Sequence, residues 1–364
     1  MKRTFCLWIC LWLGSVCSNS AEEGTRLDRQ NLLLYRKTSG EVVQGKALAD
    51  WQKRREEILR GAMSVMGPLP GDEKRTPLDV MVEEEVDCGT YFRRLISYQS
   101  EPNSRVPAYL LIPKAALEKG KKHPAVLALH PTSPEFGHKM VVGLGNRQNR
   151  SYAAELAERG FVVLAPSYPQ LANYWPDLKS LGYESGTMKA IWDNIRGMDL
   201  LDSMANVQKG HYGVIGHSLG GHNAIYTAVF DPRIKVIVSS CGFDSYLDYM
   251  NGNIKGWTHT RYMPRLLDYP LEQIPFDFHE LVGALAPRPF YINAPKGDTN
   301  FKWESVERIV AAAQPIYKLH GKAGNIHVVH PDCGHDFPPD IRYESYDFIA
   351  QALKKKTTQT RSQR

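Results

Sequence analysis

A serine between glycines has the setting that most clearly predicts chemistry in this chain of 364 residues. Ser218 lies in the segment Gly-His-Ser-Leu-Gly-Gly at 216–221, after an apolar run and before a segment with helical spacing. Gly216 and Gly220 permit a sharp strand-to-helix turn, because a side chain at either position would collide within the turn. The pattern predicts that Ser218 is a nucleophile, and a tight turn with a capping serine is the alternative.

A serine nucleophile needs a base that accepts its proton. His335 lies in the loop after the last expected strand, in the segment Asp-Cys-Gly-His-Asp-Phe at 332–337. A loop with a glycine can present an imidazole to Ser218, whereas His327 and His330 lie within or at the end of the strand itself. We therefore predict that His335 is the base.

The base in turn needs an acid that orients it. Asp298 lies in the loop after the expected strand at 289–293, between the nucleophile and the histidine in chain order. Asp244, just after the preceding strand, is the alternative acid, and either residue is a plain loop aspartate if the prediction fails. The sequence favours Asp298.

Backbone N–H groups must also face the charge that develops on a substrate carbonyl oxygen. Leu219 follows the nucleophile at the start of a helix, so its N–H is one predicted donor. The other is expected in the loop His-Pro-Thr-Ser at 130–133, where we select Thr132 because Pro131 has no N–H. A polar turn without this function is the alternative for that loop.

The elements that must position these residues follow a regular pattern from Pro124 onward. Short apolar runs alternate with helical segments, and the runs lie at 125–129, 161–166, 212–218, 235–240, 289–293 and 326–330. The helical segments lie at 151–159, 187–204, 219–229, 305–318 and 341–353. This alternation predicts an α/β protein with a parallel sheet and crossover helices.

The first part of the chain has a different pattern. Residues 48–66 have the apolar spacing of an amphipathic helix that ends at a Gly-Pro pair. Three β-rich segments at 79–86, 91–99 and 107–113 predict antiparallel strands joined by hairpins. We expect residues 21–104 to pack on a core that spans 105–353.

These segments together resemble the α/β-hydrolase superfamily, and more narrowly its dienelactone-hydrolase-like, acetyl-xylan-esterase-like and prolyl-oligopeptidase-like branches. The resemblance covers about residues 105–353 and rests on GHSLGG at 216–221, LHPTS at 129–133, APRP at 286–289 and DCGHDF at 332–337. It implies the α/β-hydrolase fold, with a mostly parallel eight-stranded sheet, helices on both faces and a catalytic triad at the carboxyl edge. Dienelactone hydrolases have a cysteine in place of Ser218, and the segment before residue 105 is too short for the propeller of prolyl oligopeptidases.

Residues 243–282 are too long for a plain crossover and are expected to form a lid-like insertion. Their aromatic residues are Phe243, Tyr246, Tyr249, Trp257, Tyr262, Tyr269, Phe276 and Phe278. Aromatic faces stack on sugar rings, so we predict that Trp257 and Tyr262 contact the substrate, with His259 and Arg261 near a substrate anion. Packing of the aromatic rings against the body, and a solvated position for the two basic residues, are the alternatives.

The composition is that of a globular protein, with 43% hydrophobic and 23% charged residues. The formal net charge of +6 comes from the two ends of the chain, so the body gives no electrostatic support for nucleic-acid binding. The cations at these ends are Lys2, Arg3, Lys354, Lys355, Lys356, Arg361 and Arg364. We expect residues 354–364 to be a basic disordered tail.

The first twenty residues contain two cations, an apolar run from Phe5 to about Val16, and then small polar residues. This order predicts a secretory signal peptide that is cleaved after Ser20, and a lipoprotein anchored through Cys17 is the alternative. No later stretch is long and apolar enough to span a bilayer. We expect a secreted or periplasmic protein without stable membrane insertion.

The cysteines fall into two groups. Cys6, Cys10 and Cys17 lie in the predicted signal peptide, and Cys88, Cys241 and Cys333 lie after it. An odd number cannot all pair internally. Buried free thiols are favoured at Cys241 and Cys333, and a disulfide between these two is the alternative.

The sequence favours a secreted serine esterase that acts through an acyl-enzyme on a small-molecule or polysaccharide ester, with acyl or methyl esters of polysaccharides as favoured substrates. A serine peptidase or amidase with the same triad is the alternative enzyme, and a binding module on a hydrolase scaffold is the alternative that is not an enzyme. No metal-ligand spacing such as H-E-x-x-H is present, so neither a metal nor a cofactor is expected. The oligomeric state stays open.

Overall fold

The computed structural model describes residues 26–354. The predicted signal peptide, with Cys6, Cys10 and Cys17, lies outside these residues, as does the tail after Lys354. Lys354 itself is the last residue of helix α7 (Pro339–Lys354). The helix therefore runs one residue beyond the predicted end of the core.

Nine strands form one sheet in the described part of the chain, in the order β11-β10-β9-β8-β6-β7-β5-β4-β3. Their bounds are β3 Met81–Asp87, β4 Tyr91–Glu101, β5 Ser104–Pro113, β6 His123–Leu129, β7 Val162–Pro166, β8 Val207–His217, β9 Ile234–Ser240, β10 Phe290–Asn293 and β11 Ile326–Val329. Strands β6 to β11 are parallel to one another, as predicted, and β3, β4 and β5 join antiparallel. Each β-rich or apolar run of the sequence forms one of these strands.

The count of nine strands corrects the eight that the family resemblance implied. Strand β4 is 11 residues long and offers β3 a full edge to pair with. Strand β3 has the sequence Met-Val-Glu-Glu-Glu-Val-Asp and is exposed over nearly its whole length. Charged side chains suit such an edge strand because they oppose pairing with another chain.

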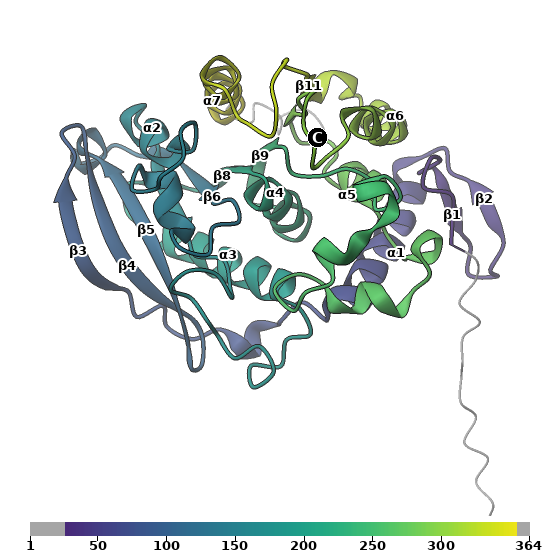
Figure 1. The fold of residues 1–364 in the computed structure, drawn as a ribbon, viewed down its shortest axis with the longest axis horizontal. Coiled ribbons are helices and arrows are strands. Elements are labelled where there is room, and N and C mark those ends of the chain that lie inside the picture. The colour runs from purple at the N-terminus through teal and green to yellow at the C-terminus, as the bar shows by residue number, and fades with distance from the viewer. Residues whose placement is uncertain (1–25, 355–364) are drawn as a thin grey trace, which may run out of the picture.

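Helices cover both faces of the sheet (Figure 1). Helices α2 (Tyr152–Glu158) and α7 share a hydrophobic cluster with one face. The helices that share the other cluster are α1 Leu48–Met66, α3 Gly186–Ser203, α4 Leu219–Phe230, α5 Phe278–Ala284 and α6 Trp303–Leu319. All six predicted helices are confirmed to within two residues at each end, and α5 is the helix that the sequence did not predict.

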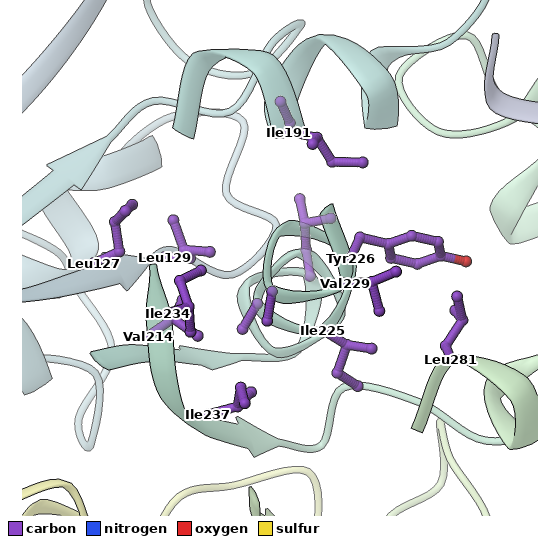
Figure 2. Close-up of a cluster of buried hydrophobic side chains, with 14 of the residues drawn as sticks. Leu127, Leu129, Ile191, Val214, Ile225, Tyr226, Val229, Ile234, Ile237 and Leu281 are labelled. Carbon is purple, nitrogen blue, oxygen red and sulfur yellow. The ribbon is translucent and has the colours of Figure 1, made fainter. Parts of the chain in front are cut away.

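Helix α4, which follows Ser218, lies at the centre of the larger core (Figure 2). All of its residues except the last are buried. Side chains from three strands and two helices surround it, among them Leu127, Leu129, Val214, Ile237, Ile191 and Leu281. This packing fixes the start of the helix, and with it the turn that holds the serine, relative to the sheet.

The insertion at 243–282 contains short 3-10 helices and the first part of α5. These are η4 Tyr249–Gly252, η5 Ile254–Trp257, η6 Pro264–Asp268 and η7 Leu271–Gln273. Asp277, the N-cap of α5, is buried and accepts hydrogen bonds from Arg29 Nη1 (2.6 Å), Ser245 Oγ (2.7 Å) and Tyr246 N (3.2 Å). The segment that begins at residue 26 therefore holds the insertion against the body.

The N-terminal part shows two further features. A two-stranded hairpin, β1 (Leu34–Arg36) with β2 (Val42–Gln44), lies in the stretch that sequence patterns left unassigned. The expected boundary at 104/105 falls between the first two residues of β5, which pairs with β4 within one sheet. The remaining 3-10 helices are η1 Asp72–Lys74, η2 Lys114–Leu117, η3 Gly137–Val142 and η8 Ala323–Asn325.

A search of the described helices finds none with the length and apolar character that crossing a bilayer requires.

Candidate active site

Ser218 occupies a strained turn between β8 and α4. Its φ of 55° and ψ of −123° lie outside the regions that residues with a side chain prefer. Its N–H donates to Ser240 O (2.8 Å) at the end of β9, and its carbonyl accepts from His222 N (3.0 Å) in α4. These bonds place the half-exposed serine at the carboxyl ends of two neighbouring parallel strands.

The glycines around the serine are required by close backbone contacts. A Cβ on Gly216 would lie 2.1 Å from Gly220 C, and a Cβ on Gly220 would lie 1.9 Å from Leu129 O. Backbone atoms cannot move aside as a flexible side chain can. The start of α4 is thus pressed against the end of β6, where the chain enters the loop at 130–133.

This contact gives a stability prediction. We expect Gly220→Ala to lower the free energy of unfolding by about 2 to 3 kcal/mol, because the methyl group must displace the end of β6. Gly324→Ala is the matched control, since a Cβ there meets nothing within 4 Å, and we expect it to change stability by less than about 0.5 kcal/mol. Urea denaturation of both variants measures the difference, and equal midpoints would show that the close contact is absent.

His335 and Asp298 form a hydrogen-bonded pair. His335 Nδ1 lies 2.9 Å from Asp298 Oδ2 and 3.0 Å from Oδ1. A carboxylate only accepts hydrogen bonds, so Nδ1 carries the proton and Nε2 keeps its lone pair. The Asp298 side chain is 1% exposed and the His335 side chain 26% exposed. The ring therefore has a buried acid behind it and a basic nitrogen free to accept a proton.

The loops that carry this pair are fixed to each other and to the sheet. Asp298 Oδ1 accepts from the N–H groups of Asn300 (2.8 Å) and Phe301 (3.2 Å), which orient the carboxylate. Gly297 N donates to Cys333 O (3.0 Å), which joins the acid loop to the histidine loop.

Arg150, a residue that sequence reasoning missed, fixes the histidine loop from the other side. Its guanidinium donates to His335 O (3.2 Å) and to Asp336 Oδ1 (2.6 Å). The partners lie 185 and 186 residues away in sequence, and no local motif signals this contact.

Ser218 and His335 lie in loops at the same edge of the sheet, the carboxyl ends of the parallel strands. His217, next to the serine, packs its ring against that of His335 at 4.9 Å between centroids. Among the described residues no hydrogen bond yet joins Ser218 Oγ to His335 Nε2, and such bonds are often long in free enzymes. Burial lowers the pKa of His217 well below its usual value, so this ring stays neutral and does not compete with His335 as a base.

The predicted oxyanion donors lie on neighbouring backbone segments. Leu219 is the first residue of α4, so its N–H has no acceptor within the helix. Thr132 is exposed in the loop after β6, the strand whose end contacts Gly220, and its Oγ1 lies 3.2 Å from Tyr262 Oη. The loop is held by His130, whose Nε2 accepts from Tyr168 N (2.9 Å) and whose Nδ1 lies 2.8 Å from Pro131 O.

The predicted substrate-binding residues have two different settings. Trp257 is 6% exposed and Tyr262 is 8% exposed. The ring of Trp257 stacks on the buried ring of His222, with 4.3 Å between centroids. Tyr262 contacts Trp257 edge-on, with 5.2 Å between centroids. Packing therefore covers much of the surface of both rings. His259 is exposed, and Arg261 is half-buried with an Nε that has no hydrogen-bond partner.

Asp244, the alternative acid, faces a different set of groups. It is buried, and its Oδ2 accepts from Lys302 N (3.1 Å), while Oδ1 has no partner. Burial raises the pKa of Asp244 to about 8, and the nearby carboxylates Asp248 and Asp277 add to this. Asp298 is thus the carboxylate that accepts from His335 Nδ1, and Asp244 is a neutral acid at pH 7.

The raised pKa of Asp244 predicts a dependence of stability on pH. The folded protein keeps a proton that the unfolded chain releases near pH 4, so the free energy of unfolding falls as the pH rises towards 8. Between pH 6 and pH 9 we expect the Tm of the wild type to fall about 3 °C more than that of Asp244→Asn. Asp248→Asn is the control, because its pKa is lowered and it does not titrate in this range. Parallel curves for Asp244→Asn and wild type would contradict the assignment.

One group of residues in the described ranges has potential metal ligands close together. The ligand atoms of Cys241, Asp298 and His335 all lie within 4.8 Å of one another. Burial raises the pKa of the Cys241 thiol well above its usual value, and Sγ donates to Asp336 O (3.3 Å). A thiol that keeps its proton is a poor ligand, so we interpret the group as an acid–base pair beside a buried thiol. Cys88, Cys241 and Cys333 are all free, so the alternative disulfide is absent.

Comparison with known proteins gives relatives along most of the chain. No family model matches it. The chain is 26% identical over 312 residues to a protein of Bacillus subtilis (strain 168) named "Putative hydrolase YtaP", and the match covers 83% of this chain and 99% of that protein.

Two solved structures share the architecture. A glucuronoyl esterase from Solibacter usitatus superposes with a TM-score of 0.72 and 19% identity, over 90% of this chain and 98% of that one. Acetyl xylan esterase 1 from Thermoanaerobacterium sp. JW/SL YS485 has a TM-score of 0.53 and 18% identity, over 82% of this chain and 92% of that one. At these identities the two structures establish a common fold.

Proposed function

This chain has the α/β-hydrolase fold, and from that premise we propose that it is a serine hydrolase that cleaves carboxylic esters of carbohydrates. The observation that supports the proposal most strongly is the hydrogen bond between Asp298 and His335 beside the turn that presents Ser218. The curated relative is named as a hydrolase, and the two structural neighbours are named as a glucuronoyl esterase and an acetyl xylan esterase. These names support the substrate class, and the geometry supports the reaction type.

In the proposed reaction Ser218 Oγ attacks the ester carbonyl while His335 Nε2 takes its proton. Asp298 stabilises the imidazolium that forms, and the N–H groups of Leu219 and Thr132 donate to the oxyanion of the tetrahedral intermediate. The alcohol leaves with the proton from His335, and an acyl-enzyme remains on Ser218. Water, activated by the same histidine, then releases the acid.

The proposal extends to substrate contacts and location. Trp257, Tyr262, His259 and Arg261 lie in the insertion, and Tyr262 reaches the loop of Thr132 through a hydrogen bond. We place a substrate anion, where one exists, near Arg261 because its guanidinium carries a positive charge on a half-buried segment of the insertion. Secretion is proposed from the first twenty residues of the sequence.

A panel of substrates tests this function against the alternatives. The protein is expected to release acetate or methanol from acetylated xylan or methyl-esterified pectin, and to leave peptide p-nitroanilides intact. Cleavage of the anilides in preference to the esters would favour the peptidase or amidase. A folded protein that cleaves neither, and binds a polysaccharide all the same, would favour the non-catalytic binding module.

A further inference from the structure

An exposed tryptophan lies on a loop that the proposed function has not used. Trp175 is 69% exposed, the highest value among the large hydrophobic side chains that the structure describes. It lies between β7 and α3, outside the aromatic insertion. Within residues 26–354 no other ring stacks on it, and most of the indole surface is available to a ligand.

The indole is held in place although it is exposed. Its Nε1 donates to Ala172 O (2.8 Å), which closes a small loop within the same segment. The segment is a tight hairpin in which Gln170 N donates to Tyr174 O (2.8 Å) and Tyr174 N donates to Leu171 O (3.0 Å). Gln170 and Ala172 have positive φ values of 60° and 47°. A fixed aromatic ring loses little entropy when a ligand stacks on it.

One side of this hairpin contacts Gly137, which follows the loop that carries a proposed oxyanion donor. A Cβ on Gly137 would lie 2.8 Å from Ala172 Cβ, so the Ala172 methyl group packs closely on the Gly137 backbone. Gly137 N also donates to Ser133 O (3.0 Å), and Ser133 follows Thr132. The hairpin of Trp175 is therefore one contact away from the proposed oxyanion loop.

The other side of the hairpin contacts the insertion. Gln170 Oε1 accepts from Thr260 Oγ1 (2.9 Å), and Tyr168 Oη donates to Arg261 O (2.9 Å). Tyr262 then returns to the oxyanion loop through its bond to Thr132.

Thr132, Gln170, Thr260 and Arg261 are thus exposed or half-exposed on connected segments that border the site and reach the hairpin of Trp175. We call this set of four residues the polar ridge. An amide, two hydroxyls and a guanidinium are groups that bond to sugar hydroxyls, and an indole face packs on the C–H groups of a sugar ring.

We propose that Trp175 is an accessory subsite that stacks on a sugar ring of a polysaccharide, beyond the sugar unit that carries the ester. The inference rests on the proposed function, because the position of the ester at the oxyanion loop sets the direction of the bound polysaccharide along the polar ridge to the hairpin. Hydroxyl groups of the intervening chain bond to the ridge. The subsite makes the protein select polymeric over small esters.

The first test compares a polymer with a small ester. For Trp175→Ala, the ratio of kcat/KM on acetylated xylan to kcat/KM on p-nitrophenyl acetate is expected to fall about tenfold. Trp175→Phe is expected to keep most of the wild-type ratio, because it retains an aromatic ring. Leu267→Ala is the matched control, because Leu267 is 68% exposed and lies outside the ridge, and its ratio should equal that of the wild type. An unchanged ratio for Trp175→Ala overturns the proposal.

The second test separates the subsite from catalysis. Isothermal titration of the Ser218→Ala protein with unesterified xylohexaose measures binding without turnover. We expect a measurable Kd that rises about tenfold when Trp175→Ala is added. If the protein proves not to be an esterase, this titration still decides the subsite. A Kd for xylohexaose that is unchanged by Trp175→Ala, or no binding of xylohexaose, overturns the proposed subsite.

Discussion

Ser218→Ala is expected to lower kcat/KM for p-nitrophenyl acetate by about 10⁵-fold, with the fold intact. The hydroxyl is the only part of the proposed machinery that forms a covalent bond to the substrate. Its loss leaves only substrate binding and oxyanion stabilisation. Alanine needs the same positive φ as serine at this turn, so the strain on the backbone changes little. The effect should therefore appear in the rate and hardly in Tm.

The measurement pairs initial rates with thermal unfolding of the same samples. Ser39→Ala is a suitable control, because Ser39 is exposed in the turn before β2. A loss of less than about tenfold in Ser218→Ala would mean that another residue is the nucleophile. A large drop in Tm would instead show that the serine stabilises the turn.

Asp298→Asn is expected to lower kcat by about 10⁴-fold at pH 7. The amide can donate to His335 Nδ1, which would then act as the acceptor and leave the proton on Nε2. In that tautomer the histidine has no lone pair directed at Ser218. The amide also lacks the charge that stabilises the imidazolium, so the transition state loses both orientation and electrostatic support.

Asp244→Asn provides the contrast to this variant. We expect its kcat to remain within about tenfold of the wild type, since Asp244 bonds to Lys302 N and not to the histidine. Measuring both variants over a range of pH decides which acid serves the base. A loss in Asp244→Asn that equals or exceeds the loss in Asp298→Asn would reverse the assignment.

The sequence was most informative where local patterns correspond to local physics. The run at 125–129 is apolar without alternation, and a strand covered on both faces buries every residue in this way. The segment 48–66 has helical spacing and is followed by a Gly-Pro pair, and α1 has these bounds. The strand order was not predicted, because no local pattern records which strands pair.

The candidate site was predictable only in part. Ser218, Asp298 and His335 follow strand ends, and the parallel sheet brings their loops to one edge. The residues that fix these loops were not predicted, because their bonds cross long stretches of the chain. Arg150 is 185 residues from His335, and His130 is 38 residues from the Tyr168 N–H that it accepts.

The sequence did not predict which aromatic side chains are exposed to solvent. The density of aromatics at 243–282 drew attention to Trp257 and Tyr262, yet a dense cluster of rings tends to pack on itself and on neighbours such as His222. Trp175 stands in a segment with ordinary composition, and its exposure depends on a hairpin with two positive φ values. The neighbouring residue types do not distinguish such a hairpin from a plain loop.

The most direct test of the central claim is the reaction of the purified protein with a fluorophosphonate, followed by mass spectrometry of the digested adduct. A serine activated by His335 and Asp298 attacks the phosphorus, displaces fluoride and keeps the phosphonyl group as a covalent adduct. We predict a single adduct on the peptide that contains Ser218, and its loss in Ser218→Ala. A folded protein that forms no adduct, or carries it on another residue, would contradict the proposed serine mechanism.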